Sequence, residues 1–216
     1  MSSFKTLAVN SVHRVVDVTV SAVGLTIAAP ILGIAVAGTL LSMGRPILFS
    51  QRRPGLYGKP FKMWKLRTMN VLPDEQQAGV PDAVRITRWG RLLRETSIDE
   101  LPELWNVFLG DMSLVGPRPL LMRYYPYFTP RERKRFEVRP GISGWAQVNG
   151  RSNVPWDERL EMDVWYVENR SLALDLRIIL RTMLRVLERK DVHAEMREDF
   201  KYDLDVERSM RRGRVS

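Results

Sequence analysis

The chain has 216 residues and a formal net charge of +9, with 34 Lys and Arg against 25 Asp and Glu. Its length predicts one domain of ordinary size, and its charge predicts an anionic partner: nucleic acid, anionic lipid headgroups or a phosphorylated substrate. The chain has no cysteine, which excludes disulfides, thiol catalysis and cysteine-bound metals. The two histidines, His13 and His193, are too few and too far apart for a typical zinc site.

Residues 18–43 contain no charged side chain, and Pro30 lies near their middle. About 20 apolar residues are needed to cross a hydrocarbon core of roughly 30 Å, so the segment is long enough to enter a bilayer. An interior proline removes a backbone hydrogen bond and kinks or breaks a helix. Each arm beside Pro30 would reach only about 18–20 Å at 1.5 Å per residue, which is too short to cross alone.

Both flanks of this segment are basic, with Lys5 and Arg14 before it and Arg45 after it. Basic residues prefer the cytoplasmic side of a membrane. A helix that enters the membrane, bends at Pro30 and returns keeps both basic flanks on the cytoplasmic side, whereas a straight crossing keeps only one of them there. We therefore predict a re-entrant membrane helix with its flanks over residues 1–45. A kinked single span and a buried soluble helix are the alternatives.

The next segments alternate short strands and short helices. Residues 47–51 and 61–69 are expected to form two strands around a turn, and the polar residues 73–82 a mobile loop. Arginines recur every three residues over 85–94, which indicates a basic amphipathic helix. Such a helix lies either in the membrane interface or on a core with a solvated face.

The remaining helices are predicted over 97–109, 129–137, 156–169 and 172–189, with a stiff loop at 115–119 and a glycine-punctuated loop at 139–151. The helix over 172–189 carries an arginine at every fourth position. That stripe predicts contact with anionic lipid, the alternative being a core-packed helix with a solvated edge. The fold class is α+β, mainly α, with residues 46–195 as a cytosolic catalytic domain with interfacial helices and 196–216 as a flexible basic tail.

Asp99 and Glu100 are the candidate catalytic residues. Ser97 followed by Glu100 also fits a capping box, a purely structural role. The same helix start would bind phosphate through its free N–H groups and its positive dipole end. There an ionised Asp99 is available as a nucleophile, and Glu100 could hold Mg²⁺, which usually takes one or two carboxylates plus substrate phosphates.

Several cations and one amide could serve such a site, although each alone could equally be a surface residue. Arg118 lies between two prolines, so its backbone is preset. The candidate phosphate and nucleotide ligands are Lys65, Arg67, Arg94, Arg118, Gln147 and Arg151.

Six blocks in order resemble the small monotopic phosphoglycosyl transferases, the polyprenyl-phosphate sugar-1-phosphate transferases of bacterial glycan assembly. The resemblance covers roughly residues 12–192. The blocks are the apolar segment with Pro30, QRRPG (51–55), FKMWKLRTM (61–69), SIDELPELWNV (97–107), GDMSLVGPRP (110–119) and RPGISGWAQVNGR (139–151). Any one block is weakly specific, but six in order are highly specific. The family breaks its re-entrant helix at a Ser-Pro pair, and this chain has Ala29 before Pro30.

The resemblance implies that a UDP-sugar donates its sugar-1-phosphate to a polyprenyl (undecaprenyl) phosphate and that UMP leaves. It implies Asp99 as the nucleophile, Mg²⁺ as the cofactor with Glu100 as its ligand, or alternatively Glu100 as a base. The expected location is the cytoplasmic face of the bacterial inner membrane, against anionic lipids. A non-catalytic lipid-binding module and a nucleic-acid binder are the competing interpretations, but the second leaves the apolar segment unexplained. The sugar and a possible homodimer stay open.

Overall fold

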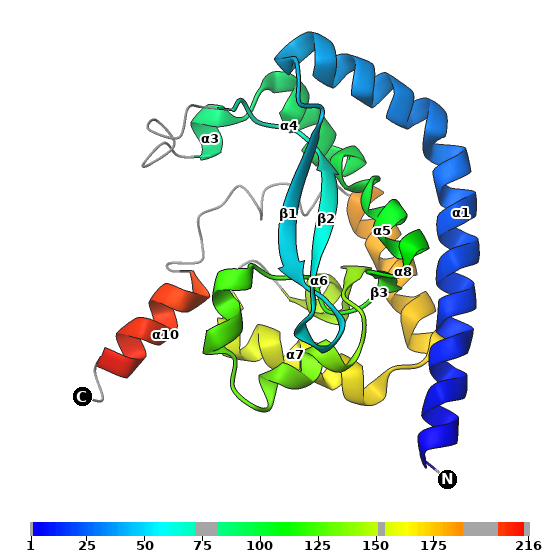
Figure 1. The fold of residues 1–216 in the computed structure, drawn as a ribbon, viewed down its shortest axis with the longest axis vertical. Coiled ribbons are helices and arrows are strands. Elements are labelled where there is room, and N and C mark those ends of the chain that lie inside the picture. Colours follow the sequence, from blue (N-terminus) through cyan, green and yellow to red (C-terminus); the bar gives the residue numbers. More distant parts are fainter. Residues whose placement is uncertain (1, 72–81, 151–153, 188–202, 214–216) are drawn as a thin grey trace.

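The computed structural model describes residues 2–71, 82–150, 154–187 and 203–213. A long N-terminal helix, α1 (Ser2–Met43), lies along one side of a domain made of short helices and two small sheets (Figure 1). The predicted composition, mainly helical with a small β-hairpin, is confirmed.

The β-hairpin pairs β1 (Leu48–Pro54) with β2 (Pro60–Leu66) in antiparallel register, close to the two strands predicted. The turn contains the 3-10 helix η1 (Leu56–Gly58). A second, parallel pair joins β3 (Ser113–Val115) to β4 (Gly141–Ser143). This pair was not predicted, because three-residue strands are too short to show an alternating pattern.

The helices between and after the strands are short. They are α3 (Asp82–Arg85), α4 (Arg88–Glu95), α5 (Glu103–Leu109), α6 (Trp145–Asn149), α7 (Trp156–Asn169), α8 (Leu172–Leu187) and α10 (Leu204–Gly213), with 3-10 turns η2 (Ile98–Glu100), η3 (Met122–Tyr127) and η4 (Glu132–Glu137). The helix predicted over 156–169 is confirmed at both ends. Helix α6 lies inside the stretch predicted as an irregular loop, and the loop predicted over 73–82 lies almost wholly outside the described residues.

Helix α1 continues through Pro30 rather than breaking there, and Figure 1 shows it bending on its way from the side of α5 to α4. Pro30 is the one proline within it, and proline is one of the few recognised causes of a sharp helix bend. By length and composition alone, the part Ser11–Met43 could cross a membrane.

The N-terminal arm of α1 is held to the domain by polar contacts. Arg14 donates to the carbonyls of Val107 and Phe108 at 2.6 and 2.7 Å, which satisfies orphan carbonyls at the end of α5. Asp17 accepts from the Ser113 hydroxyl and the Leu114 N–H at 2.7 and 2.9 Å. These contacts join α1 to both α5 and β3.

The C-terminal arm of α1 is held mainly by close packing. Ala35 is buried with Leu66 and Leu93, and the Trp89 indole N–H donates to the Thr39 hydroxyl at 3.2 Å. A Cβ at Gly38 would lie 2.2 Å from the Trp89 ring, so only glycine fits there. This arm therefore docks on α4 of the same domain.

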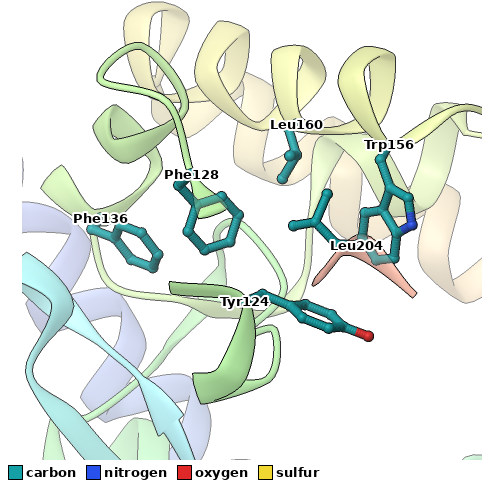
Figure 2. Close-up of a cluster of buried hydrophobic side chains, with 6 residues drawn as sticks. All are labelled: Tyr124, Phe128, Phe136, Trp156, Leu160 and Leu204. Atoms are coloured by element: carbon teal, nitrogen blue, oxygen red, sulfur yellow. The ribbon is translucent and has the colours of Figure 1, made fainter. Parts of the chain in front are cut away.

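Residues 204–213 form helix α10, where the sequence analysis predicted a flexible basic tail over 196–216. Leu204 of α10 is fully buried with Tyr124, Phe128, Trp156 and Leu160, in the cluster that Figure 2 shows. Its helix is fixed by ion pairs from Arg208 to Glu132 and Asp157 and from Arg211 to Asp157. The prediction failed because it read the arginines as lipid or solvent contacts and overlooked acidic partners distant in the sequence.

The arginine stripe of α8 also differs from its prediction. Arg181 donates to the Asn149 side chain at 2.5 Å, and Arg185 donates to the Gln147 carbonyl at 3.0 Å, so both bind the domain rather than facing outward. Arg177 is exposed. The outward surface of α8 is instead apolar, with exposed Leu172, Leu176, Leu180, Met183 and Leu184.

Candidate active site

Asp99 and Glu100 lie in a 3-10 turn, not in the continuous helix predicted over 97–109. Ser97 has a left-handed backbone (φ 55°) and makes no capping hydrogen bond, so the capping-box alternative is wrong. Pro102 follows and has no N–H to donate, and α5 begins only after it. The turn leaves Asp99 buried, at 7% exposed, one residue before the cation-bound Glu100.

Glu100 is bound by two of the predicted cations. Its Oε1 lies 2.5 Å from the Lys65 ammonium and 2.8 Å from the Arg118 guanidinium. Burial acts to raise the pKa of Glu100, but the charges of Arg118 and Lys65 and their hydrogen bonds outweigh it and lower the pKa to about 2. The structure therefore brings together three residues that are far apart in the sequence, as predicted.

Glu103, which the sequence analysis did not select, lies on the other side of Lys65. Its Oε1 is 3.3 Å from the Lys65 ammonium, and the side chain is 2% exposed. Burial raises the pKa of Glu103 to about 7, and the charge of Glu100 adds to the shift while Lys65 and Arg118 oppose it. Its position one turn after Glu100 on a helix start is the signal that would have identified it.

Arg53 is a second residue that the sequence analysis missed. It donates to the Gln51 side chain at 2.7 Å and to the Pro119 carbonyl at 3.3 Å. Its bond to the Pro119 carbonyl sets Arg53 beside the loop that carries Arg118. Burial and the nearby charge of Arg118 lower the pKa of Arg53 to about 10. The signal was in the hairpin register: Arg53 pairs with Phe61, so it shares a face of the sheet with Lys65.

Arg118 is held in place by contacts behind it. The Arg135 guanidinium donates to the Arg118 carbonyl at 2.8 Å and is itself paired with Asp163 at 2.7 Å. Both Arg135 and Asp163 are buried. Because the backbone of Arg118 is also flanked by Pro117 and Pro119, its guanidinium is presented to Glu100 from a rigid loop.

The other predicted ligands are not seen to join this cluster. Arg67 donates to the carbonyls of Met43 and Gly44 at 2.5 and 2.7 Å, so it caps the end of α1. Arg94 donates to the Thr68 hydroxyl at 3.0 Å, and Gln147 donates to the Ile142 carbonyl at 3.2 Å. Arg151 lies outside the described residues.

Residues 8–189 match the family described as bacterial sugar transferase. The chain belongs to the bacterial sugar transferase family. An uncharacterized sugar transferase, EpsL of Bacillus subtilis, is 49% identical over 81% of this chain and 86% of its own length.

Two further relatives have names that state a donor sugar nucleotide and a lipid acceptor. The UDP-glucose:undecaprenyl-phosphate glucose-1-phosphate transferase of Caulobacter vibrioides is 43% identical over 84% of this chain and 72% of its own length. The protein of the same name in Escherichia coli is 36% identical over 80% of this chain but only 39% of its own length. This sugar transferase therefore matches most of some relatives and less than half of others.

The charge cluster of this sugar transferase suits phosphate chemistry. Lys65, Arg118 and Arg53 offer partly buried positive charge where phosphate oxygens would gather negative charge. The described residues hold no cluster of three or more His, Asp or Glu that could bind a metal alone. Mg²⁺ usually needs only one or two carboxylates with substrate phosphates. Glu100 fits that need through Oε2, because both cation contacts use Oε1.

Proposed function

We propose that this protein transfers sugar-1-phosphate from a UDP-sugar to a membrane polyprenyl phosphate and releases UMP. The observation that carries the proposal is the Asp99–Glu100 pair: a buried aspartate beside a glutamate that two cations hold, in a chain of the bacterial sugar transferase family. The UDP-glucose:undecaprenyl-phosphate glucose-1-phosphate transferases among its relatives support the substrate classes.

The reaction is divided into two displacements. In the first, an Asp99 carboxylate oxygen forms a bond to the sugar-linked β-phosphorus, and the bond from that phosphorus to the bridging oxygen breaks, so that UMP leaves with the electron pair. In the second, an oxygen of the polyprenyl phosphate attacks the same phosphorus, and the Asp99 carboxylate leaves. A covalent intermediate avoids bringing two anionic substrates together at once.

The cations of the cluster stabilise the negative charge that develops on phosphate oxygens. Lys65 and Arg118 do so while holding Glu100 in place, and Arg53 adds a third charge on the same side. Mg²⁺, held by Glu100, would neutralise diphosphate charge when bound. This would leave Asp99 as the group that forms the covalent bond.

We further propose that the protein is monotopic on the cytoplasmic face of the inner membrane. Both arms of α1 bind one domain, so a straight crossing would have to detach one of them. Many apolar side chains of α1, α5 and α8 are exposed, more than a soluble surface usually carries. They include Val23, Ile27, Ile34, Leu41, Trp105, Leu109, Leu176, Leu180, Met183 and Leu184.

The test is a UMP-release assay with a panel of UDP-sugars, polyprenyl phosphate and Mg²⁺. At least one UDP-sugar is expected to give UMP together with a polyprenyl diphosphate-sugar. Sugar nucleotide hydrolysis without lipid product, or no UMP from any UDP-sugar, would contradict the proposal. Omitting Mg²⁺ in the presence of EDTA is expected to reduce the rate strongly.

Arg53 offers a matched pair of variants in the same assay. Arg53→Gln is expected to lower kcat/KM about 10²-fold, the order lost when one charge-stabilising donor is removed. Arg52→Gln is the control, because Arg52 is the next residue of the same strand, is exposed and faces the opposite side of the sheet. It is expected to stay within about twofold of the parent enzyme, as removal of an exposed charge changes little.

A further inference from the structure

A shallow apolar hollow adjoins the charge cluster. Its volume is about 310 Å³, and it is lined by Leu48, Trp64, Pro102 and Trp105. Leu48 and Trp105 are 45% and 48% exposed, so the hollow is open on its outer side. Nothing in the two displacement steps proposed above uses these four residues.

One wall of the hollow adjoins the reacting groups. Pro102 directly follows the turn that carries Asp99 and Glu100 and precedes Glu103. Successive strand residues face opposite sides of a sheet, so Leu48 and Trp64 lie on the face of the hairpin opposite to Lys65. A ligand in the hollow would therefore approach the proposed phosphate site past Pro102.

The hollow is also a rigid part of the fold. Asn106 of α5, fully buried, accepts from the Trp64 N–H at 3.1 Å and donates to the Lys62 carbonyl at 2.7 Å. These two bonds tie α5 to β2, which carry Trp105 and Trp64 respectively. Trp105 stacks on Phe108, with ring centroids 5.5 Å apart, so its indole is supported from the same helix.

The surroundings favour a lipid over a nucleotide in the hollow. Leu109, one turn after Trp105 on α5, is a further exposed apolar residue on this side of the helix. On the same helix, Leu104 lies against Gly24 of the apolar α1. A uracil base would leave its polar edge without partners against leucine and proline, which is costly, whereas an isoprene chain has no polar atoms.

We propose that this hollow binds the isoprene units nearest the phosphate of the polyprenyl phosphate, and so sets the lipid phosphate beside the turn that carries Asp99 and Glu100. The proposal rests on the function proposed above. The volume is at the low end of the roughly 300–1,000 Å³ of small-molecule pockets, so the hollow takes only the first few units. The rest of the chain stays in the bilayer.

The test separates the two half-reactions with the variant Trp105→Ala in the full-length protein. Its KM for polyprenyl phosphate is expected to rise about tenfold, as an apolar site loses one aromatic wall. Transfer of sugar phosphate from UDP-sugar to Asp99, measured without lipid, is expected to keep the parent rate. That half-reaction also reports that the variant is folded.

The matched control is Leu109→Ala, which removes an exposed apolar side chain from the same helix but outside the hollow. Its KM for polyprenyl phosphate is expected to stay within twofold. Equal increases for both variants would mean general membrane contact and would overturn the proposal. An increase in the KM for UDP-sugar alone would assign the hollow to the nucleotide and overturn it as well.

A second variant, Leu48→Ala, tests the same hollow if Trp105→Ala does not fold. It trims the opposite, β1 wall and is expected to raise the same KM by a smaller factor. An unchanged KM in every folded hollow variant would overturn the proposed lipid site while leaving the enzyme activity intact. Failure of the proposed function itself would look different, because the parent protein would then release no UMP.

Discussion

The two arms of α1 contact the same domain by different means. The N-terminal arm uses charge: Arg14 binds carbonyls at the end of α5, and Asp17 binds β3. The C-terminal arm adds close packing to such contacts: Gly38 lets the Trp89 ring approach the helix closely, and Arg67 binds the carbonyls at the helix end. Polar anchoring suits a segment near water, and close packing with small residues is the means by which helices associate where no hydrophobic force acts between them.

Between these two anchored arms, the helix is apolar and much less supported. A Cβ at Gly33 would meet nothing within 4 Å, and Ile27 and Ile34 are 69% and 68% exposed. This difference indicates that the contacts of both arms with the domain, together with Pro30, keep the helix bent. The predictions below test each anchor in turn.

The largest expected loss of stability comes from Asp17→Ala. The change leaves the Leu114 N–H and the Ser113 hydroxyl without their charged partner, at an expected cost of about 3 kcal/mol in the free energy of unfolding. Denaturant unfolding in detergent measures it. Ser21→Ala, one turn further on, removes only a local bond to the Val18 carbonyl and is expected to cost about 1 kcal/mol or less. Equal losses of unfolding free energy in the two variants would show that the bonds from Asp17 to Ser113 and Leu114 do not anchor the helix.

A pair of glycine variants tests the packed anchor. Gly38→Ala would place a Cβ 2.2 Å from the Trp89 ring and is expected to destabilise the protein by about 1–3 kcal/mol through overpacking. Gly33→Ala meets no atom and is expected to stabilise the helix by roughly 0.5–1 kcal/mol. Thermal unfolding in the same detergent compares the two, and the same sign for both would contradict the assigned difference.

Glu103 tests the start of α5, the helix whose other end Arg14 holds. The pKa of Glu103, raised to about 7, means that ionising this carboxyl costs more in the folded protein than in the unfolded chain. The parent protein should therefore lose stability as the pH rises from about 4.5 through 7, because the unfolded carboxyl releases its proton first.

In Glu103→Gln this loss is expected to be absent, so the variant's Tm relative to the parent should increase by about 5–10 °C between pH 5 and pH 8. Differential scanning fluorimetry at both pH values measures it. Glu158→Gln, an exposed residue of α7, is the control and should show no such trend. A pH-independent difference for Glu103→Gln would show that its ionisation is not coupled to folding.

Pro30→Ala is expected to change stability least, because both arms keep their contacts with the domain. The membrane topology can be read in the parent and in this variant with single cysteines at positions 3 and 50, since the chain has none of its own. A membrane-impermeant thiol reagent should label both positions from the same side. Labelling from opposite sides would establish a crossing helix.

Features with a local cause were predictable from the sequence. The turn-rich stretch between two short strand-like runs predicted the hairpin, and a helix was predicted over the residues of α7. Glu100, Lys65 and Arg118 were selected as members of one site from adjacent carboxylates, a rigid loop and the family resemblance, and the structure brings them together, although the helix start expected there is a 3-10 turn.

Features that depend on distant partners were not predictable. Arg53 and Glu103 join the cluster only through the register of the hairpin and the approach of α5. Arg181 and Arg185 of α8 were predicted to contact lipid, but in the structure they bind the Asn149 side chain and the Gln147 carbonyl. The ordered α10 depended in the same way on Asp157 and Glu132, which no local pattern links to it.

The most direct test of the central claim is intact-protein and peptide mass spectrometry after incubation with the accepted UDP-sugar and Mg²⁺ but no lipid. The account predicts an added sugar phosphate on the peptide that contains Asp99, its discharge when polyprenyl phosphate is supplied, and no adduct in Asp99→Asn. An adduct that persists in Asp99→Asn, or full turnover by that variant, would show that another group carries the sugar phosphate.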